Sequence, residues 1–278
     1  MVIPMYNKQR FISRTLRSVL AQTVAPSEII VIDDGSTDRS LKVAEDILAP
    51  ISSARIVRQA NQGVSAARNA GARLSSADFI AFLDADDEWF PGHLAVLRDL
   101  AVDFPDAEVV LARHCRELDG HRIKQILGLP PGVRGIVDDF VNTYRLGSGL
   151  VHSSAVAIRP RAFAACGGFP VGATRGEDIY LWLRLGLCRQ IAFNDTTTVI
   201  WHDDGSDAEN RSAVLPYHLE RFLDPATEPN YWTVPELKRF LRKSLIINIL
   251  SATHQQQASL VRRLLHLSRR LEVWVFAG

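Results

Sequence analysis

The chain has 278 residues, of which 47% are hydrophobic and 23% are charged. These proportions are typical of an ordinary globular protein, and they exclude the disordered, fibrous and collagen-like classes. The formal net charge is only +1, so we predict no nucleic-acid partner.

Three cysteines lie far apart in the chain and form no C-x-x-C pair: Cys115, Cys166 and Cys188. This spacing predicts no disulfide framework and favours buried thiols in a reducing compartment, hence a cytoplasmic location. The chain has no run of eighteen uninterrupted apolar residues, so the sequence predicts no membrane-spanning helix.

From residue 1 to about residue 110, short apolar runs alternate with stretches of helical periodicity. This alternation is typical of successive β-α units in a mostly parallel sheet. Strands are predicted at residues 1–3, 29–32, 55–58 and 79–83. Helices are predicted at residues 11–22, 36–48, 63–74 and 91–104. The first strand has only three residues where about five or six are usual, so we expect it to be incomplete.

Beyond residue 110 the pattern is weaker. It predicts strands at 150–158 and 196–201, a helix at 177–187, and helices with polar breaks from residue 215. Residues 113–148 carry no readable signal, and we expect substrate specificity to lie in such loops.

The last part of the chain is basic and amphipathic. From Val234 onward, eight Lys or Arg residues stand against two Glu, a surplus of +6. One helical face is apolar: Leu237, Phe240, Leu241, Leu245, Ile246 and Ile249. Two interpretations are open, and the commoner is a helical cap packed on the rest of the chain. The other is peripheral contact of these basic helices with an anionic membrane surface.

Two predicted strands end in carboxylates. Ile29 to Ile32 form an unbroken apolar run, which indicates a strand buried on both faces, and Asp33 and Asp34 follow it. The second cluster is Asp84, Asp86 and Asp87 in FIAFLDADDEW, residues 79–89. In open α/β sheets, ligands bind at the carboxyl ends of the strands.

Asp84 and Asp86 would point the same way in an extended chain, and such paired oxygens suit Mg²⁺ or Mn²⁺ together with a substrate phosphate. An isolated D-x-D is more often a solvated acidic loop, but its position after a buried strand favours a site here.

Three further residues each leave two interpretations open. Arg68, in NQGVSAARNAG at residues 61–71, could clamp a phosphate or be a surface cation. Asp178 stands at a predicted helix start, where the helix dipole favours an ionised carboxylate able to act as a base; the plainer role is a simple N-terminal charge. His202 could bind a metal or be merely structural.

Taken together, these motifs resemble family 2 glycosyltransferases with a GT-A fold. The series is IPMYN at 3–7, VIDDGSTD at 31–38, N-x-G-x-x-x-A-R-N-x-G at 61–71 and LDADD at 83–87, continued by ACGGF at 165–169 and GEDIYLWLRL at 176–185. The resemblance implies an α/β fold: a GT-A (Rossmann-like), mostly parallel central sheet flanked by helices. It also implies a catalytic domain at 1–210, with a nucleotide-sugar half (1–110) and an acceptor half (111–210), and a C-terminal helical extension at 211–278.

The resemblance also implies roles for individual residues. For the nucleotide sugar they are Pro4, Tyr6, Asp34, Arg68 and Asp84, with Tyr6 and Asp34 at the base. For a Mn²⁺ or Mg²⁺ ion they are Asp86 and His202, and for the acceptor Gly168, Glu177 and Trp182. Asp178 would be the catalytic base.

The implied activity is inverting transfer of a single sugar from a nucleoside diphosphate sugar, expected to be a UDP-sugar, to a glycan or lipid-linked saccharide. Such a reaction belongs to polysaccharide or cell-envelope synthesis at the inner face of the cytoplasmic membrane. The chain lacks the Gln-x-x-Arg-Trp signature of processive synthases, which favours single transfer.

The main alternative is a non-catalytic GT-A scaffold that binds a sugar nucleotide or a partner enzyme, although retention of Asp84, Asp86 and Asp178 weighs against it. A sugar-nucleotide pyrophosphorylase would need a Gly-rich loop where this chain has Pro4-Met5-Tyr6-Asn7. Absence of G-x-G-x-x-G after the first strand and of G-x-x-x-x-G-K-[ST] argues against a dinucleotide-binding oxidoreductase and a P-loop NTPase.

Overall fold

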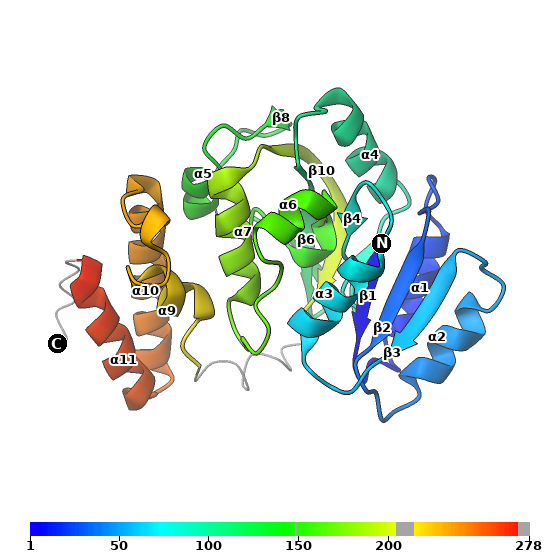
Figure 1. The fold of residues 1–278 in the computed structure, drawn as a ribbon, viewed down its shortest axis with the longest axis horizontal. Coiled ribbons are helices and arrows are strands. Elements are labelled where there is room, and N and C mark those ends of the chain that lie inside the picture. Colours follow the sequence, from blue (N-terminus) through cyan, green and yellow to red (C-terminus); the bar gives the residue numbers. More distant parts are fainter. Residues whose placement is uncertain (148, 204–213, 272–278) are drawn as a thin grey trace.

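The structure is a computed structural model that describes residues 1–147, 149–203 and 214–271. Two sheets lie side by side at its centre, and the C-terminal helices stand at the end opposite the first sheet (Figure 1).

The first sheet is parallel, with strand order β1-β2-β3. Its strands are β1 (Val2–Met5), β2 (Ile29–Asp33) and β3 (Ala54–Arg58). The helices between and after them are α1 (Ile12–Leu20), α2 (Ser40–Leu48) and α3 (Val64–Leu74). The predicted β-α units are therefore confirmed, with boundaries shifted by one to a few residues.

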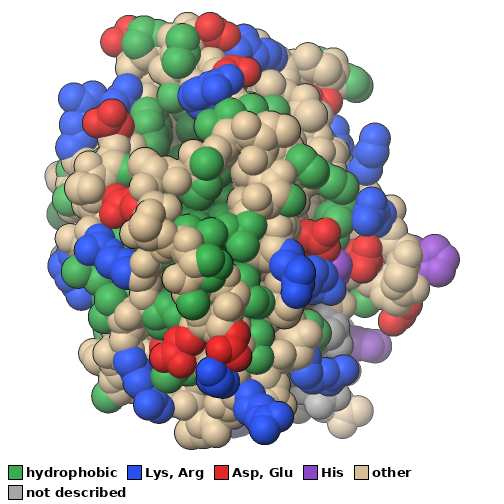
Figure 2. All heavy atoms as spheres, turned by 90° about the vertical axis from the view of Figure 1, so that its right-hand side faces the viewer, with side chains coloured by type: hydrophobic (Ala, Val, Ile, Leu, Met, Phe, Trp, Pro, Cys, Tyr) green, Lys and Arg blue, Asp and Glu red, His purple; other side chains and the backbone are tan. Residues whose placement is uncertain are grey.

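Strand β2 shows why its sequence lacks alternation. Ile30 and Ile32 enter one core cluster with Ala67 of α3, whereas Ile29 and Val31 enter a second cluster with the buried residues of α1 and α2. Both faces of the strand are buried, so every position is apolar. On the outer face formed by α1 and α2, basic and acidic side chains are interspersed (Figure 2).

The second sheet is mixed. Its main path is β4-β9-β6-β10-β5, with β7 paired to β6 and β8 to β10. The strands are β4 (Ile80–Ala81), β5 (Glu88–Trp89), β6 (Val109–Leu118), β7 (His121–Lys124), β8 (Arg134–Ile136), β9 (Val156–Ile158) and β10 (Ile191–His202). Among these pairs, β6 and β10 are parallel and the others antiparallel, so the parallel pattern predicted from the sequence holds best in the first half.

Helices cover the second sheet and extend beyond it. They are α4 (His93–Asp103), α5 (Phe140–Leu146), α6 (Pro160–Ala165), α7 (Glu177–Cys188), α9 (Tyr217–Phe222), α10 (Pro235–His254) and α11 (Ala258–Ser268). Short 3-10 turns occur at Ser153–Ala155, Pro229–Tyr231 and Arg269–Leu271.

The apolar face of α10 packs inward. Of the six apolar residues noted in its sequence, five are buried and only Ile246, 44% exposed, is not. They join the same core cluster as α7 and α11, which is the arrangement expected of a packed helical cap. No helix in the described part of the chain is long and apolar enough to cross a membrane.

Two local predictions need correction. The strand expected at 150–158 is regular only at Val156–Ile158, because hydrogen bonds between Ser154 and the acidic residues Asp84 and Asp87 shape the Ser153–Ala155 turn. The cysteines form no disulfide, as expected, but Cys188, the last residue of α7, is exposed rather than buried.

Candidate active site

The acidic loop after β4 is a tight turn rather than an extended segment. The amide N–H of Asp87 donates to the carbonyl oxygen of Asp84 at 3.1 Å. Thr15 of α1 holds the turn from outside, since its hydroxyl lies 3.0 Å from the carbonyl oxygen of Ala85 and 2.8 Å from that of Asp87. The expectation that Asp84 and Asp86 point the same way assumed an extended chain; in the turn, Asp84 and Asp87 come together instead.

Arg68 pairs with Asp84 beneath this loop. Its Nη2 lies 2.5 Å from Oδ1 of Asp84, and its guanidinium stacks 4.8 Å from the ring centroid of Phe169. Only 4% of Arg68 is exposed, so it is not a surface cation. Burial alone would raise the pKa of Asp84. The charge and hydrogen bond of Arg68, together with the charges of His152 and Lys8, outweigh burial and lower that pKa. The Nε and Nη1 atoms of Arg68 are buried and have no hydrogen-bond partner among the described residues.

Asp87 and His152 complete a cluster with Asp84. Asp87 is fully buried and accepts hydrogen bonds from the Ser154 hydroxyl and the His202 main-chain N–H. Burial, followed by the charges of Asp84 and Asp86, raises the pKa of Asp87 well above its usual value.

Potential ligand atoms of Asp84, Asp87 and His152 lie within 4.8 Å of one another. Two carboxylates and an imidazole are a donor set that suits Mn²⁺, and a cation would relieve the repulsion among the crowded carboxylates. The residues present therefore fit a divalent metal.

Asp86 and His202, the ligands implied by the family resemblance, have other partners here. Lys8 Nζ lies 2.5 Å from Oδ2 of Asp86. The His202 ring lies between two glutamates, with Nδ1 3.1 Å from Glu117 and Nε2 3.5 Å from Glu88. Their metal role stays a prediction, beside the Asp84–Asp87–His152 cluster.

The residues predicted to contact the nucleotide base lie in β1 or just after the carboxyl ends of β1 and β2. Pro4 is buried within β1, and Tyr6, just after this strand, is 46% exposed. Asp34 accepts hydrogen bonds from the main-chain N–H groups of Gln62 and Gly63 at 3.0 and 2.8 Å. Asp34 thereby fixes the loop that leads into α3, and its contact with a base stays a prediction.

Asp178 lies in the first turn of α7, and its Oδ1 accepts a hydrogen bond from the main-chain N–H of Ile179 at 2.7 Å. Its charge reaches the acidic cluster: burial lowers the pKa of His152, while Asp84, Asp178 and Asp86 each oppose that shift. The pKa of Arg68 is raised because its carboxylate neighbours, Asp84 first and then Glu177 and Asp178, outweigh its burial. The charge of Asp178 therefore acts on both His152 and Arg68.

The Gly-Gly-Phe turn is bonded to the helix that carries Arg68. Asn69 donates to the carbonyl oxygen of Phe169 at 2.7 Å and accepts from its N–H at 2.9 Å. Gly168 has φ +67°, and a β-carbon there would approach Oδ1 of Asn69 to 2.7 Å, so only glycine fits this turn.

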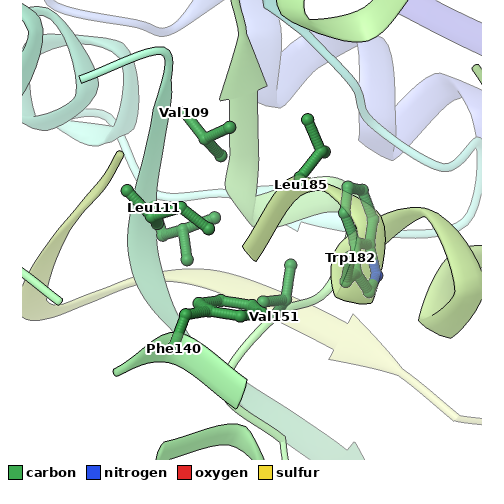
Figure 3. Close-up of a pocket in the computed structure, with 7 residues that line it drawn as sticks. Val109, Leu111, Phe140, Val151, Trp182 and Leu185 are labelled. Carbon is green, nitrogen blue, oxygen red and sulfur yellow. The ribbon is translucent and has the colours of Figure 1, made fainter. Parts of the chain in front are cut away.

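Trp182 lies in the core, 1% exposed, with its ring edge-to-face against Phe169. Figure 3 shows it beside Leu185 on the wall of a small apolar pocket. The pocket is lined by Val109, Leu111, Phe140, Val151, Trp182, Leu185 and Ile191. Glu177 is 6% exposed. Acceptor contacts by Gly168, Glu177 and Trp182 stay predictions.

Comparison with known proteins identifies the family. The model of glycosyl transferase family 2 matches residues 1–152, more than half of the chain. The chain belongs to this family. Among similar structures is that of S. aureus TarS residues 1–349, with a TM-score of 0.61 over 99% of this chain and 92% of that one at 17% identity. This likeness confirms the predicted GT-A fold.

Curated relatives of the family 2 chain match less than half of its length. EpsJ of Bacillus subtilis, an uncharacterized glycosyltransferase, is 42% identical over 86 residues, which are 31% of this chain and 25% of EpsJ. The uncharacterized glycosyltransferase alr2836 of Nostoc is 40% identical over 128 residues, 43% of this chain and 37% of that protein. The matched part thus spans well under two thirds of either relative.

Sequence reasoning on the family 2 chain missed two residues of the cluster. Asp87 was recognised only as part of the acidic run, and its pairing with Asp84 depends on the turn. His152 belongs to no motif. It lies close to Asp87 because β9 pairs with β4, the strand before the acidic loop, and Ser154 is bonded to Asp84 and Asp87. Its ring stacks on Trp201 with centroids 5.2 Å apart.

Proposed function

We propose that the chain is an inverting glycosyltransferase that moves one sugar from a UDP-sugar to a hydroxyl group of a glycan or lipid-linked saccharide. This proposal is supported by the cluster of Asp84, Asp87 and His152, in which potential ligand atoms from two distant parts of the chain lie within 4.8 Å of one another. The donor class is supported by a structure of S. aureus TarS in complex with UDP-GlcNAc, which shares the fold.

On the donor side, Arg68 supplies a positive charge held in place by Asp84. Its two unpartnered N–H groups suit hydrogen bonds to pyrophosphate oxygens, because guanidinium groups bind phosphate with directional, charge-assisted bonds. Asp84, Asp87 and His152 would hold Mn²⁺ or Mg²⁺, which offsets the negative charge that develops on the leaving diphosphate.

On the acceptor side, Asp178 acts as the general base. Its carboxylate takes the proton of the acceptor hydroxyl while that oxygen bonds to the anomeric carbon, and the bond from this carbon to the diphosphate oxygen breaks with its electron pair. Attack from the face opposite the leaving group inverts the anomeric centre. The helix dipole at the start of α7 favours the ionised carboxylate that this step needs.

Asp178→Asn tests the base. General-base assistance is typically worth about 10²- to 10⁴-fold, so transfer should fall by that factor while UDP binding stays unchanged in calorimetry. Glu236→Gln is the matched control, because Glu236 is also an acidic residue in the first turn of a helix but stands on α10. Normal transfer by Asp178→Asn would remove this carboxylate from the role.

The donor and metal are found by measuring UDP release from a panel of UDP-sugars with Mn²⁺ or after EDTA treatment. Activity that survives exhaustive EDTA would refute the metal. Nucleotide binding without release from any donor would instead match the non-catalytic scaffold.

His152→Gln and His202→Gln separate the two ligand sets, since Mn²⁺ binding measured by calorimetry should weaken only for the histidine that holds the ion. The proposal does not extend to membrane contact, because packing already accounts for the apolar face of α10.

A further inference from the structure

The residues that lead into Asp178 are held by the C-terminal helices. Arg175 and Gly176 precede α7 and carry its first turn, and α9 and α10 stand beside that helix (Figure 1). The contacts between these segments are polar and specific, although most of the buried surface of α10 is apolar.

Arg175 is bound to α9, to α10 and to the segment before α9. Its Nη2 donates to Oδ1 of Asn248 on α10 at 2.6 Å, and its Nη1 donates to the carbonyl oxygen of Val214 at 3.1 Å. Its own carbonyl oxygen accepts from the N–H of Tyr217, the first residue of α9, at 2.8 Å. Burial lowers the pKa of the Arg175 guanidinium, so a polar partner is needed to offset the lost hydration.

Gly176 is held against α9 by close contact. His218 is 1% exposed, and a β-carbon on Gly176 would approach its Nδ1 to 2.5 Å. The other ring nitrogen of His218 lies 2.8 Å from the hydroxyl oxygen of Ser244 on α10. Gly176 also has φ +74°, so both the backbone conformation and the contact demand glycine.

Ser244 and Asn248 stand four residues apart, one turn along the same face of α10. Asn248 Nδ2 donates to the carbonyl oxygen of Ser244 at 2.8 Å, which fixes the orientation of the amide toward Arg175. Asn248 is the single polar residue among the seven buried residues of α10. An apolar residue would satisfy packing there, so the amide has a role that packing does not explain.

We propose that α10 positions the catalytic base: Asn248 through Arg175, and Ser244 through His218 and Gly176, aim the first turn of α7 and therefore Asp178. This inference rests on the proposed function of Asp178. Asn248 does not touch the reacting atoms, so it is a positioning residue. A displacement of about 1 Å in a catalytic group can lower the rate about 10²-fold, so loss of the contact should appear in kcat.

Asn248→Leu tests the inference, because it keeps the side-chain bulk and removes the oxygen that Arg175 binds. With Mn²⁺ and the UDP-sugar of highest turnover in the panel, kcat for UDP release should fall by about tenfold or more while the donor KM changes by less than about twofold. Asn248→Asp retains the acceptor oxygen and should recover kcat to within about threefold of the parent. Ser251→Leu, an exposed site on the same helix, is the matched control and should leave kcat unchanged.

All variants are assayed well below their unfolding midpoints, so a purely structural role for Asn248 would lower the midpoint without lowering kcat. Parental kcat in Asn248→Leu, or no recovery in Asn248→Asp, would overturn the inference. Asp178→Asn is measured alongside. If it is inactive while Asn248→Leu is normal, only the positioning inference fails; if it is active, the proposed base fails.

Discussion

Removal of Arg68 is the sharpest test of the donor side. The Arg68–Asp84 pair is largely buried, with side chains 5% and 23% exposed, and Nη2 of Arg68 lies 2.5 Å from Oδ1 of Asp84. Deleting one partner of a buried ion pair typically costs about 3–5 kcal/mol, because the other charge is left uncompensated. Since part of Asp84 reaches solvent, we expect Arg68→Met to lower the free energy of unfolding by about 3 kcal/mol at neutral pH, measured by urea unfolding.

The loss should depend on pH with a defined sign. In the parent the pKa of Asp84 is lowered, so its stabilisation is present above its unfolded pKa and is lost only as pH falls through the lower, folded value. In Arg68→Met, the charge of Arg68 no longer offsets the burial of Asp84 beside Asp86 and Asp87, so the pKa of Asp84 rises. The difference between parent and variant should therefore shrink between neutral pH and about pH 5.

Two further variants test whether the charges of Arg68 and Asp84 are coupled. Arg68→Met combined with Asp84→Asn removes both charges of the pair and should recover about half of the loss or more. Arg161→Met breaks an ion pair whose arginine is 73% exposed and should cost about 0–1 kcal/mol. The coupling is refuted if Arg68→Met lowers the free energy of unfolding no more than Arg161→Met does. It is also refuted if the double variant is no more stable than Arg68→Met. Arg68→Met should also weaken UDP binding about tenfold or more if Arg68 meets the phosphates.

Three buried histidines have a pKa lowered to about 3 by burial: His93, His114 and His218. Only the unfolded chain takes up these protons near pH 6.5. The free energy of unfolding should therefore fall by about 1.4 kcal/mol per pH unit for each histidine as pH drops from 6.5 toward 3. In His93→Gln, the free energy measured by urea unfolding should fall less steeply with pH, by that amount per pH unit. Asp87→Asn removes a carboxylate with a raised pKa and should stabilise the metal-free protein by about 1 kcal/mol while Mn²⁺ binding is lost; a lower thermal midpoint would contradict this. Gly176→Ala should destabilise more than Gly172→Ala, because both pay about 1–2 kcal/mol for a positive φ but only at Gly176 does the β-carbon meet a neighbour; equal losses would refute the clash with His218.

The first ninety residues were predictable because their signals are local. Strand β2 reads as an unbroken apolar run since both of its faces are buried, and α3 follows directly from a helical period. Strands β7 and β8 carried no such signal: every residue of β7 is exposed, and only the middle residue of β8 is not, so burial imposes no alternation on them. Helix α5 has seven residues, too few for a clear period.

The site residues that lie in sequence motifs were predictable. Those brought to the site only by the folded chain were not. Asp84 and Arg68 lie in separate motifs and were assigned to one ligand, and they do form a pair. Whether Asp86 or Asp87 lies beside Asp84 depends on a four-residue turn, which the D-x-D spacing does not encode. His152 lies near Asp87, about 65 positions away, and Arg175 donates to Asn248, 73 positions away. Only the folded chain brings such residues together.

The two sheets meet along a narrow seam. Val2 forms an isolated parallel bridge with Phe82, and the N–H of Leu83 donates to the carbonyl oxygen of Val2 at 3.0 Å. Asp34 follows a strand of the first sheet and Asp84 a strand of the second. A sugar nucleotide that binds both residues would therefore hold the two sheets together. At a concentration of about one hundred times its dissociation constant, such a ligand would add about 2.7 kcal/mol to the free energy of unfolding. Such a ligand would then also protect the folded chain against heat and proteolysis.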